Sequence, residues 1–224
     1  MKINEIELPK YSHKEDSLNS LTHGIGSAIF FILGLNLLAK ASAKSKYEFL
    51  CIGIYLLSLI TTLLISAIYH GLNNEKYKKI FRVLDHSSIF LLISGTYTPY
   101  TLIALKNVSI FSLKEGVFGL IIFSFVWLCS IIGIILNYFN FKKFQVVSII
   151  LYLLEGWCII IAFKSILIEI GTLAAVLLLC GGIVYSIGVI FYSIGKKIKY
   201  IHSVFHIFVL IASLLMFISV YMII

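Results

Sequence analysis

Charged residues are scarce in this chain: they make up 12% of its 224 residues, whereas 60% are hydrophobic. Soluble domains are nearer half apolar and a quarter charged, so this composition excludes an ordinary soluble protein. The polar segments between the apolar stretches are short and leave no room for a separate soluble domain. The composition therefore predicts an integral membrane protein.

Cysteine is also rare, and each of its four residues stands alone inside an apolar stretch, at Cys51, Cys129, Cys158 and Cys180. This scatter predicts small buried side chains and excludes a disulfide framework or a CxxC metal site. The N-terminus lacks the basic, apolar and small-residue succession of a signal peptide, so we expect none to be removed. Proline occurs only twice, and Pro9 disfavours a helix across the first residues. We expect residues 1–19 to form a polar tail.

Long apolar stretches, by contrast, fill the rest of the chain. They lie roughly at residues 20–40, 49–70, 83–105, 116–137, 144–163, 171–192 and 201–223. Each has about the twenty residues that a helix needs to cross the hydrocarbon core of a bilayer. The pattern predicts an all-α integral membrane fold, with residues 20–224 forming one bundle of seven transmembrane helices.

Positive charge is distributed unequally between the two sides of this predicted bundle. One side carries twelve basic residues: Lys2, Lys10, Lys14, Lys76, Lys78, Lys79, Arg82, Lys142, Lys143, Lys196, Lys197 and Lys199. The other carries six: Lys40, Lys44, Lys46, Lys106, Lys114 and Lys164. Because cytoplasmic loops carry the excess of Lys and Arg, the N-terminus is predicted in the cytoplasm and the C-terminus outside. The same loops account for the net charge of +8 and favour contact with anionic lipids rather than with nucleic acid.

Histidines mark a candidate metal site. His202 and His206 are four residues apart, so on a helix both imidazoles leave the same face. Two histidines in an apolar helix are costly in hydrocarbon unless they are satisfied, and a metal ion is the most economical partner. The second stretch ends with Ser66 and His70, again four apart, and the third begins near Asp85. In the predicted topology all five residues lie at one depth, in the cytoplasmic leaflet.

Three histidines with one open position are typical of a catalytic zinc site, although imidazole also binds other transition metals. The open position would take water, which zinc makes acidic enough to ionise near neutral pH. Asp85 could accept a proton from that water. Ser66 could donate a hydrogen bond to the water or to a developing oxyanion.

Three further polar residues have simpler interpretations. His23 is predicted at the cytoplasmic boundary, where a hydrated structural or interfacial role is favoured. His86 is predicted to face a loop or to pack. Glu155 lies near the middle of the fifth stretch, where an acid is a functional candidate. The absence of a second acid nearby favours a glutamic acid that is hydrogen-bonded to a neighbouring helix.

The chain resembles the bacterial hemolysin III family, within the progestin and adipoQ receptor superfamily. The matching motifs are ExxxNxxTHG (Glu15, Asn19, Thr22, His23 and Gly24), SAIYH, LDHSSIFLLISGTYTP, GGIVYSIGVIFY and HSVFH. The resemblance implies seven transmembrane helices in a bacterial plasma membrane, with the N-terminus in the cytoplasm. It also implies zinc bound by His70, His202 and His206, with Ser66 and Asp85 at the site. Glu155 matches none of these motifs.

Three functions are compatible with this resemblance. Some relatives in the superfamily resemble alkaline ceramidases, which implies a zinc-dependent hydrolase of a lipid amide or ester that enters laterally from the bilayer. The family name suggests a pore-forming, haemolytic protein, but the predicted spans carry no polar stripe for a water-filled pore. A lipid sensor or receptor with structural zinc is the third. The sequence leaves the substrate and the oligomeric state open.

Overall fold

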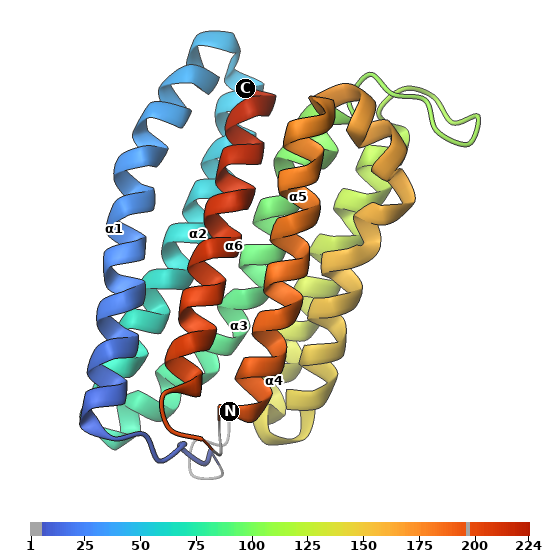
Figure 1. Cartoon of the computed structure of the whole chain (residues 1–224). Helices are drawn as coiled ribbons and strands as arrows, with labels where there is room; N and C mark the ends of the chain where they lie inside the picture. Colours follow the sequence, from blue (N-terminus) through green and yellow to red (C-terminus); the bar gives the residue numbers. More distant parts are fainter. Residues whose placement is uncertain (1–5, 196–197) are drawn as a thin grey trace.

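The computed structural model describes residues 6–195 and 198–224, and every regular element in these ranges is helical (Figure 1). The elements are α1 (His13–Lys44), α2 (Lys46–Gly71), α3 (Glu75–Pro99), the π-helical turn η2 (Tyr100–Ala104), α4 (Val117–Trp157), the 3₁₀ turn η3 (Cys158–Ala162), α5 (Phe163–Ile194) and α6 (Ile201–Ile223). Within the described ranges, four stretches are long and apolar enough to cross a membrane: α1, α2, the segment Val117–Ile194 and α6. The predicted all-α membrane architecture is confirmed at this level.

Helix α4 is a helical hairpin broken at Asn140, whose backbone is extended (φ −151°, ψ 85°). Two hydrogen bonds join its halves. The Ser130 hydroxyl donates to Oε2 of Glu155 at 3.0 Å, and the Ser148 hydroxyl donates to Oδ1 of Asn137 at 2.9 Å. In each pair one residue precedes the break and the other follows it, and the pair nearer to the break in sequence lies inside the other, so the two halves run antiparallel. The break falls between the predicted stretches 116–137 and 144–163.

Helix α5 contains a second break, at Gly171, where φ is 80° and ψ is 162°. Only glycine adopts such a conformation readily. The indole Nε1 of Trp157 donates to the hydroxyl of Ser186 at 3.0 Å, which brings the end of α4 beside the second half of α5. The chain therefore reverses again near Gly171, close to the predicted start of the sixth stretch.

The helix starts follow ordinary capping chemistry. Ser12 and Glu15 form a capping box at the start of α1: Ser12 N–H donates to Oε2 of Glu15 at 2.9 Å, and Glu15 N–H donates to the Ser12 hydroxyl at 3.3 Å. Helix α1 therefore begins at His13 rather than near residue 20. The Ser45 and Asn74 side chains cap α2 and α3 by accepting hydrogen bonds from backbone N–H groups of the first turn.

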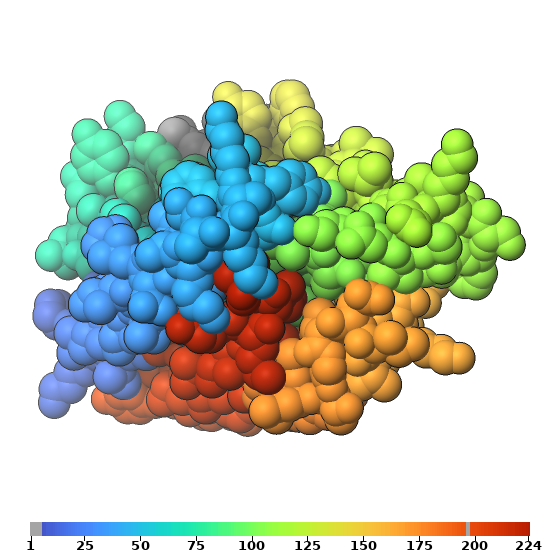
Figure 2. Space-filling model, turned by 90° about the horizontal axis from the view of Figure 1, so that it is seen from above, coloured from blue at the N-terminus to red at the C-terminus, as the bar shows by residue number. Residues whose placement is uncertain are grey.

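Packing of the helices leaves apolar side chains on the outside of the bundle. Ile32, Leu57 and Ile168 are 66%, 69% and 69% exposed, which suits contact with lipid chains rather than with water. Helix α6 packs against α1 on one side and α5 on the other, and Figure 2 shows its end between them. The described N-terminal segment and the start of α6 lie at one end of the bundle, and the C-terminus lies at the other (Figure 1).

Candidate metal centre

Three buried histidines meet where α2 ends and α6 begins, a region called here the histidine end of the bundle. His70, His202 and His206 are 2%, 5% and 1% exposed. Each offers one ring nitrogen, and these three nitrogens lie within 4.8 Å of one another. The Nε2 atoms of His202 and His206 are 3.2 Å apart, close to the edge of roughly 3.3 Å of a tetrahedron with zinc–nitrogen bonds near 2.0–2.1 Å. The structure thus brings together the three predicted metal ligands.

One face of α1 fixes the start of α6. Glu15 and Asn19 are one helical turn apart and project from the same face. Glu15 accepts a hydrogen bond from the backbone N–H of Tyr200 at 2.8 Å. The Ser203 hydroxyl donates to Oδ1 of Asn19 at 2.6 Å. Since Ser203 lies beside His202, these contacts set the position of the α6 histidines.

His23 continues the same face of α1, one turn beyond Asn19. Its ring stacks on His206, with the ring centroids 3.7 Å apart and the planes at 15°. His23 is 4% exposed, so the expectation of a hydrated boundary residue is wrong. Its expected structural role agrees with this stacking, which restricts the orientation of the His206 ring.

A carboxylate on α1 contacts the third histidine. Oδ1 of Asp16 is 2.8 Å from Nδ1 of His70, and Oδ2 of Asp16 accepts from Nζ of Lys78 at 2.6 Å. Asp16 is not among the candidate site residues that the sequence analysis identified. The contact joins α1, α2 and α3 at the histidine end.

The described chain before α1 also packs on this end. Ile6 is buried, and Glu7 pairs with Lys142, which lowers the pKa of the Glu7 carboxyl. The Tyr11 ring stacks on His202, with centroids 4.9 Å apart and planes at 20°. Burial raises the pKa of the Tyr11 phenol. Tyr11 therefore covers the metal ligand from the side of the N-terminal segment.

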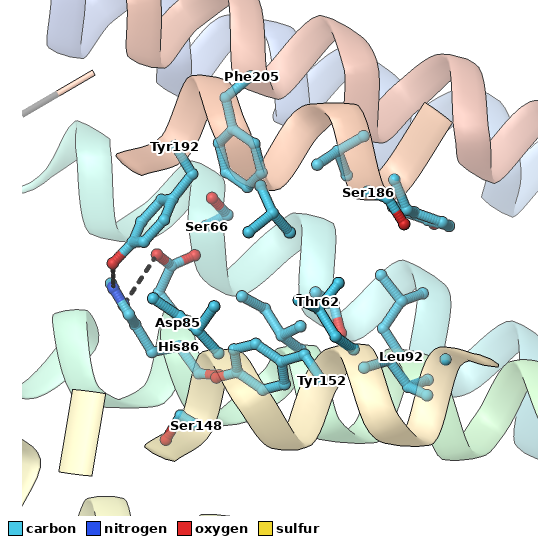
Figure 3. A pocket seen from close by; sticks show the side chains of 18 of the residues that line it. Thr62, Ser66, Asp85, His86, Leu92, Ser148, Tyr152, Ser186, Tyr192 and Phe205 are labelled. Carbon is cyan, nitrogen blue, oxygen red and sulfur yellow. Dashed lines mark hydrogen bonds and ion pairs between the residues drawn. The ribbon is translucent and has the colours of Figure 1, made fainter. Parts of the chain in front are cut away.

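Ser66 and Asp85 lie together in a cavity wall beside the histidines (Figure 3). The Ser66 hydroxyl interacts with the Asp85 carboxylate, whose Oδ2 lies 3.7 Å from Nδ1 of His86. His86 does not face a loop: it lines the cavity, with Nε2 2.8 Å from the Tyr192 hydroxyl. Asp85 is outside the group of possible metal ligands, which suits a residue that acts beside a metal rather than on it.

The cavity extends from the histidine end into the bundle between α3, α4, α5 and α6. Its surface is overwhelmingly apolar, and its lining residues include His202, His206, Ser66 and Asp85. Leu153 is among the residues that line the cavity.

Glu155 is fully buried in the α4 hairpin, away from the three-histidine group. It accepts the hydrogen bond of Ser130, from the other half of the hairpin, at 3.0 Å. The predicted hydrogen bond to a neighbouring helix is confirmed. This contact gives Glu155 a packing role in the hairpin.

The residues at the histidine end fit a divalent transition metal. Nε2 of His70 is buried without a hydrogen-bond partner among the described residues. The Nε2 atoms of the other two rings lie 3.2 Å apart, a separation that also suits two nitrogens bound to one metal ion. Neutral imidazoles are ligands that zinc accepts, and three of them leave one coordination position open.

Comparison with known proteins points to one group. A sequence profile described as "Haemolysin-III related" matches residues 11–217. The chain is 36% identical to "Hemolysin-3" of Bacillus cereus over 213 residues, covering 92% of this chain and 90% of the relative. It is 36% identical to "Hemolysin-3 homolog" of Bacillus subtilis (strain 168) over 215 residues, 94% of both chains. The human "Monocyte to macrophage differentiation factor" is 25% identical over 205 residues, 89% of this chain and 80% of the relative.

Proposed function

The chain belongs to the haemolysin-III-related family, and we propose that it is a zinc-dependent hydrolase of a lipid amide or ester. The observation that carries this proposal is a group of three buried histidines, two of which line an apolar cavity together with Ser66 and Asp85. A cavity of this kind accepts an acyl chain and holds its polar end beside the histidines.

The proposal includes a membrane arrangement. Seven crossings follow if the two halves of α4 and the second half of α5 each span the bilayer beside α1, α2, α3 and α6. The excess of Lys and Arg then orients the histidine end toward the cytoplasm of a bacterial cell, in its plasma membrane. Maleimide labelling of Lys76→Cys and Lys114→Cys variants, made in a background without the native cysteines, tests this arrangement. Lys76→Cys should react only from the cytoplasmic side and Lys114→Cys only from outside.

Each polar residue has a role in the proposed reaction. His70, His202 and His206 hold zinc, which when bound supplies a Lewis acid and lowers the pKa of water. Asp85 accepts a proton from the attacking water as its oxygen adds to the carbonyl carbon. Ser66 donates a hydrogen bond to the oxygen that gains negative charge. The carbon–nitrogen or carbon–oxygen bond then breaks, the proton passes to the leaving amine or alcohol, and a fatty acid remains.

Purified protein in nanodiscs provides the test. The wild type should contain about one zinc per chain and should release fatty acid from an N-acyl sphingoid lipid or from a lipid ester. Asp85→Asn should lower turnover by roughly 10² to 10⁴-fold, the usual contribution of a positioned general base. His70→Ala should lose both zinc and turnover.

Glu155→Gln is the matched control, because it removes a buried carboxyl that lies outside the three-histidine group. It should keep zinc and turnover. Undiminished fatty-acid release by a His202→Ala/His206→Ala double variant would contradict the proposal.

Membrane lysis is a second candidate, supported by the names of the relatives that are 36% identical. A lytic protein should release dye from liposomes, and this release should persist in the His202→Ala/His206→Ala variant. A third candidate is a lipid sensor in which zinc is structural, since the cavity and the histidines would serve binding equally well. It predicts zinc-dependent thermal stability and saturable lipid binding without any product.

A further inference from the structure

We infer that Asp16 is a positioning residue for the metal centre, which fixes the ring of His70 and directs its Nε2 atom toward the metal. This inference rests on the metal site of the proposed function, but it concerns a residue on α1 that is neither a ligand nor a cavity residue. It assigns a role to the contact between Asp16 and His70, which are 54 residues apart in the sequence.

The charges around Asp16 determine which nitrogen of His70 carries the proton. Nζ of Lys78 lies 2.6 Å from Oδ2 of Asp16, and a neighbouring ammonium group favours the ionised carboxylate. An ionised carboxylate only accepts hydrogen bonds. Nδ1 of His70 must therefore donate to Oδ1 of Asp16 across 2.8 Å, which leaves the lone pair of the neutral ring on Nε2.

The Nε2 atom of His70 is free to bind a metal. It is buried and has no hydrogen-bond partner among the described residues, and it belongs to the group whose ring nitrogens lie within 4.8 Å of one another. Asp16 thus supplies the proton acceptor on one side of the ring, and the metal would occupy the other. Carboxylates that bond to metal-bound histidines in this way fix the ring and raise its basicity.

His202, by contrast, has no carboxylate partner among the described residues. Its Nδ1 atom is buried and has no hydrogen-bond partner among the described residues, and the ring is held by stacking on Tyr11. Stacking restricts the plane of a ring but does not select the nitrogen that carries the proton. Of these two histidines, only His70 therefore has a carboxylate that selects the nitrogen carrying the proton.

Lys78 orients Asp16 in turn. The Lys78 ammonium occupies one carboxylate oxygen and leaves the other to His70. An alternative role for Asp16 is a simple ion pair with Lys78 that ties α1 to α3. The side chains of that pair are 14% and 18% exposed, so a loss of stability on substitution would not distinguish the two roles. The two roles predict different effects on zinc affinity.

Zinc affinity of the full-length protein in detergent, measured by competition with a chromogenic chelator, separates the two roles. Asp16→Asn and Asp16→Ala should bind zinc about 10–100-fold more weakly than the wild type, the usual effect of removing the partner of a metal-bound histidine. Lys78→Met keeps the carboxylate on His70 but removes the ammonium group that orients it, so it should weaken zinc binding less than Asp16→Ala does. Glu75→Gln is the charge-matched control, since it removes an exposed ion pair with Lys79 at the same end of the molecule.

Cobalt gives a readout that does not depend on turnover. The visible absorption bands of Co²⁺-loaded protein report the geometry of the ligands, and they should shift in Asp16→Ala but not in Glu75→Gln. The thermal stability of the metal-free proteins verifies that each variant folds.

The possible outcomes are distinct. If folded Asp16→Asn and Asp16→Ala bind zinc as tightly as the wild type, the role of Asp16 is refuted while the metal site stands. If Lys78→Met weakens zinc binding as strongly as Asp16→Ala, the ion pair rather than the histidine contact is responsible, and the inference is overturned. A wild-type protein that binds no zinc refutes the proposed function and this inference together.

Discussion

The buried hydrogen bond between Asn19 and Ser203 supports the sharpest stability prediction. The Ser203 hydroxyl donates to Oδ1 of Asn19 at 2.6 Å, and the two residues are 0% and 4% exposed. The bond joins α1 to the first turn of α6, between His202 and His206. Removal of either side chain leaves the other polar group buried without its hydrogen-bond partner.

The expected free energies follow from that burial. Asn19→Leu strands the Ser203 hydroxyl and should lower the free energy of unfolding by about 1–3 kcal/mol. Ser203→Ala strands Oδ1 of Asn19, whose Nδ2 is already without a partner, and should have an effect of about 1–3 kcal/mol. Asn19→Leu/Ser203→Ala removes both polar groups, so its effect should be smaller than the sum of the two single effects by about 1 kcal/mol or more.

Reversible unfolding in mixed micelles, followed by circular dichroism in the presence of a chelator, measures this double-mutant cycle. Metal is removed so that the result reports the helix contact alone. Single effects that add to within about 0.3–0.5 kcal/mol would mean that the two residues are independent. That result would refute the structural argument that this bond fixes the start of α6.

Two further predictions concern packing. A Cβ atom on Gly133 would overlap with the Phe90 ring, so Gly133→Ala should destabilise the α3–α4 contact by about 1–3 kcal/mol. Gly53→Ala is the control, because a Cβ atom there has no described neighbour within 4 Å. Equal melting temperatures for the two variants would contradict the expected clash. Tyr11→Ala should expose His202, which Tyr11 covers, and should accelerate the loss of zinc to a chelator. Tyr77→Ala, which removes an exposed ring, is the control and should not change the rate of zinc loss. Equal rates for the two variants would show that Tyr11 does not protect the site.

Much of the metal centre could be predicted from the sequence because its ligands are spaced by whole helical turns. His202 and His206 share a helix face whatever the tertiary structure. His70 joined them only through the predicted order and direction of the spans, and the structure brings all three together. The hydrogen bond of Glu155 was predictable as well. A buried carboxyl group with no second acid nearby needs a hydrogen bond to a neutral polar group.

The contacts of α1 could not be predicted in the same way. Glu15 and Tyr200 are 185 residues apart, and the acid is equally suited to the first turn of any helix. The spacing of Glu15, Asn19 and His23 was the available signal, because three polar residues at intervals of four define one face of a helix. The start of α1 was also readable from Ser12 and Glu15, which have the spacing of a capping box.

The position of α6 in the chain has a consequence for biogenesis. Two of the three candidate ligands lie on the helix that is synthesised after all the others. Chains fold progressively from the N-terminus, so a nascent protein with α1 to α5 inserted still presents a single histidine of the set. Under the proposed function, metal loading therefore follows insertion of α6, and cells starved of zinc should accumulate a fully inserted apoprotein rather than a truncated or uninserted one.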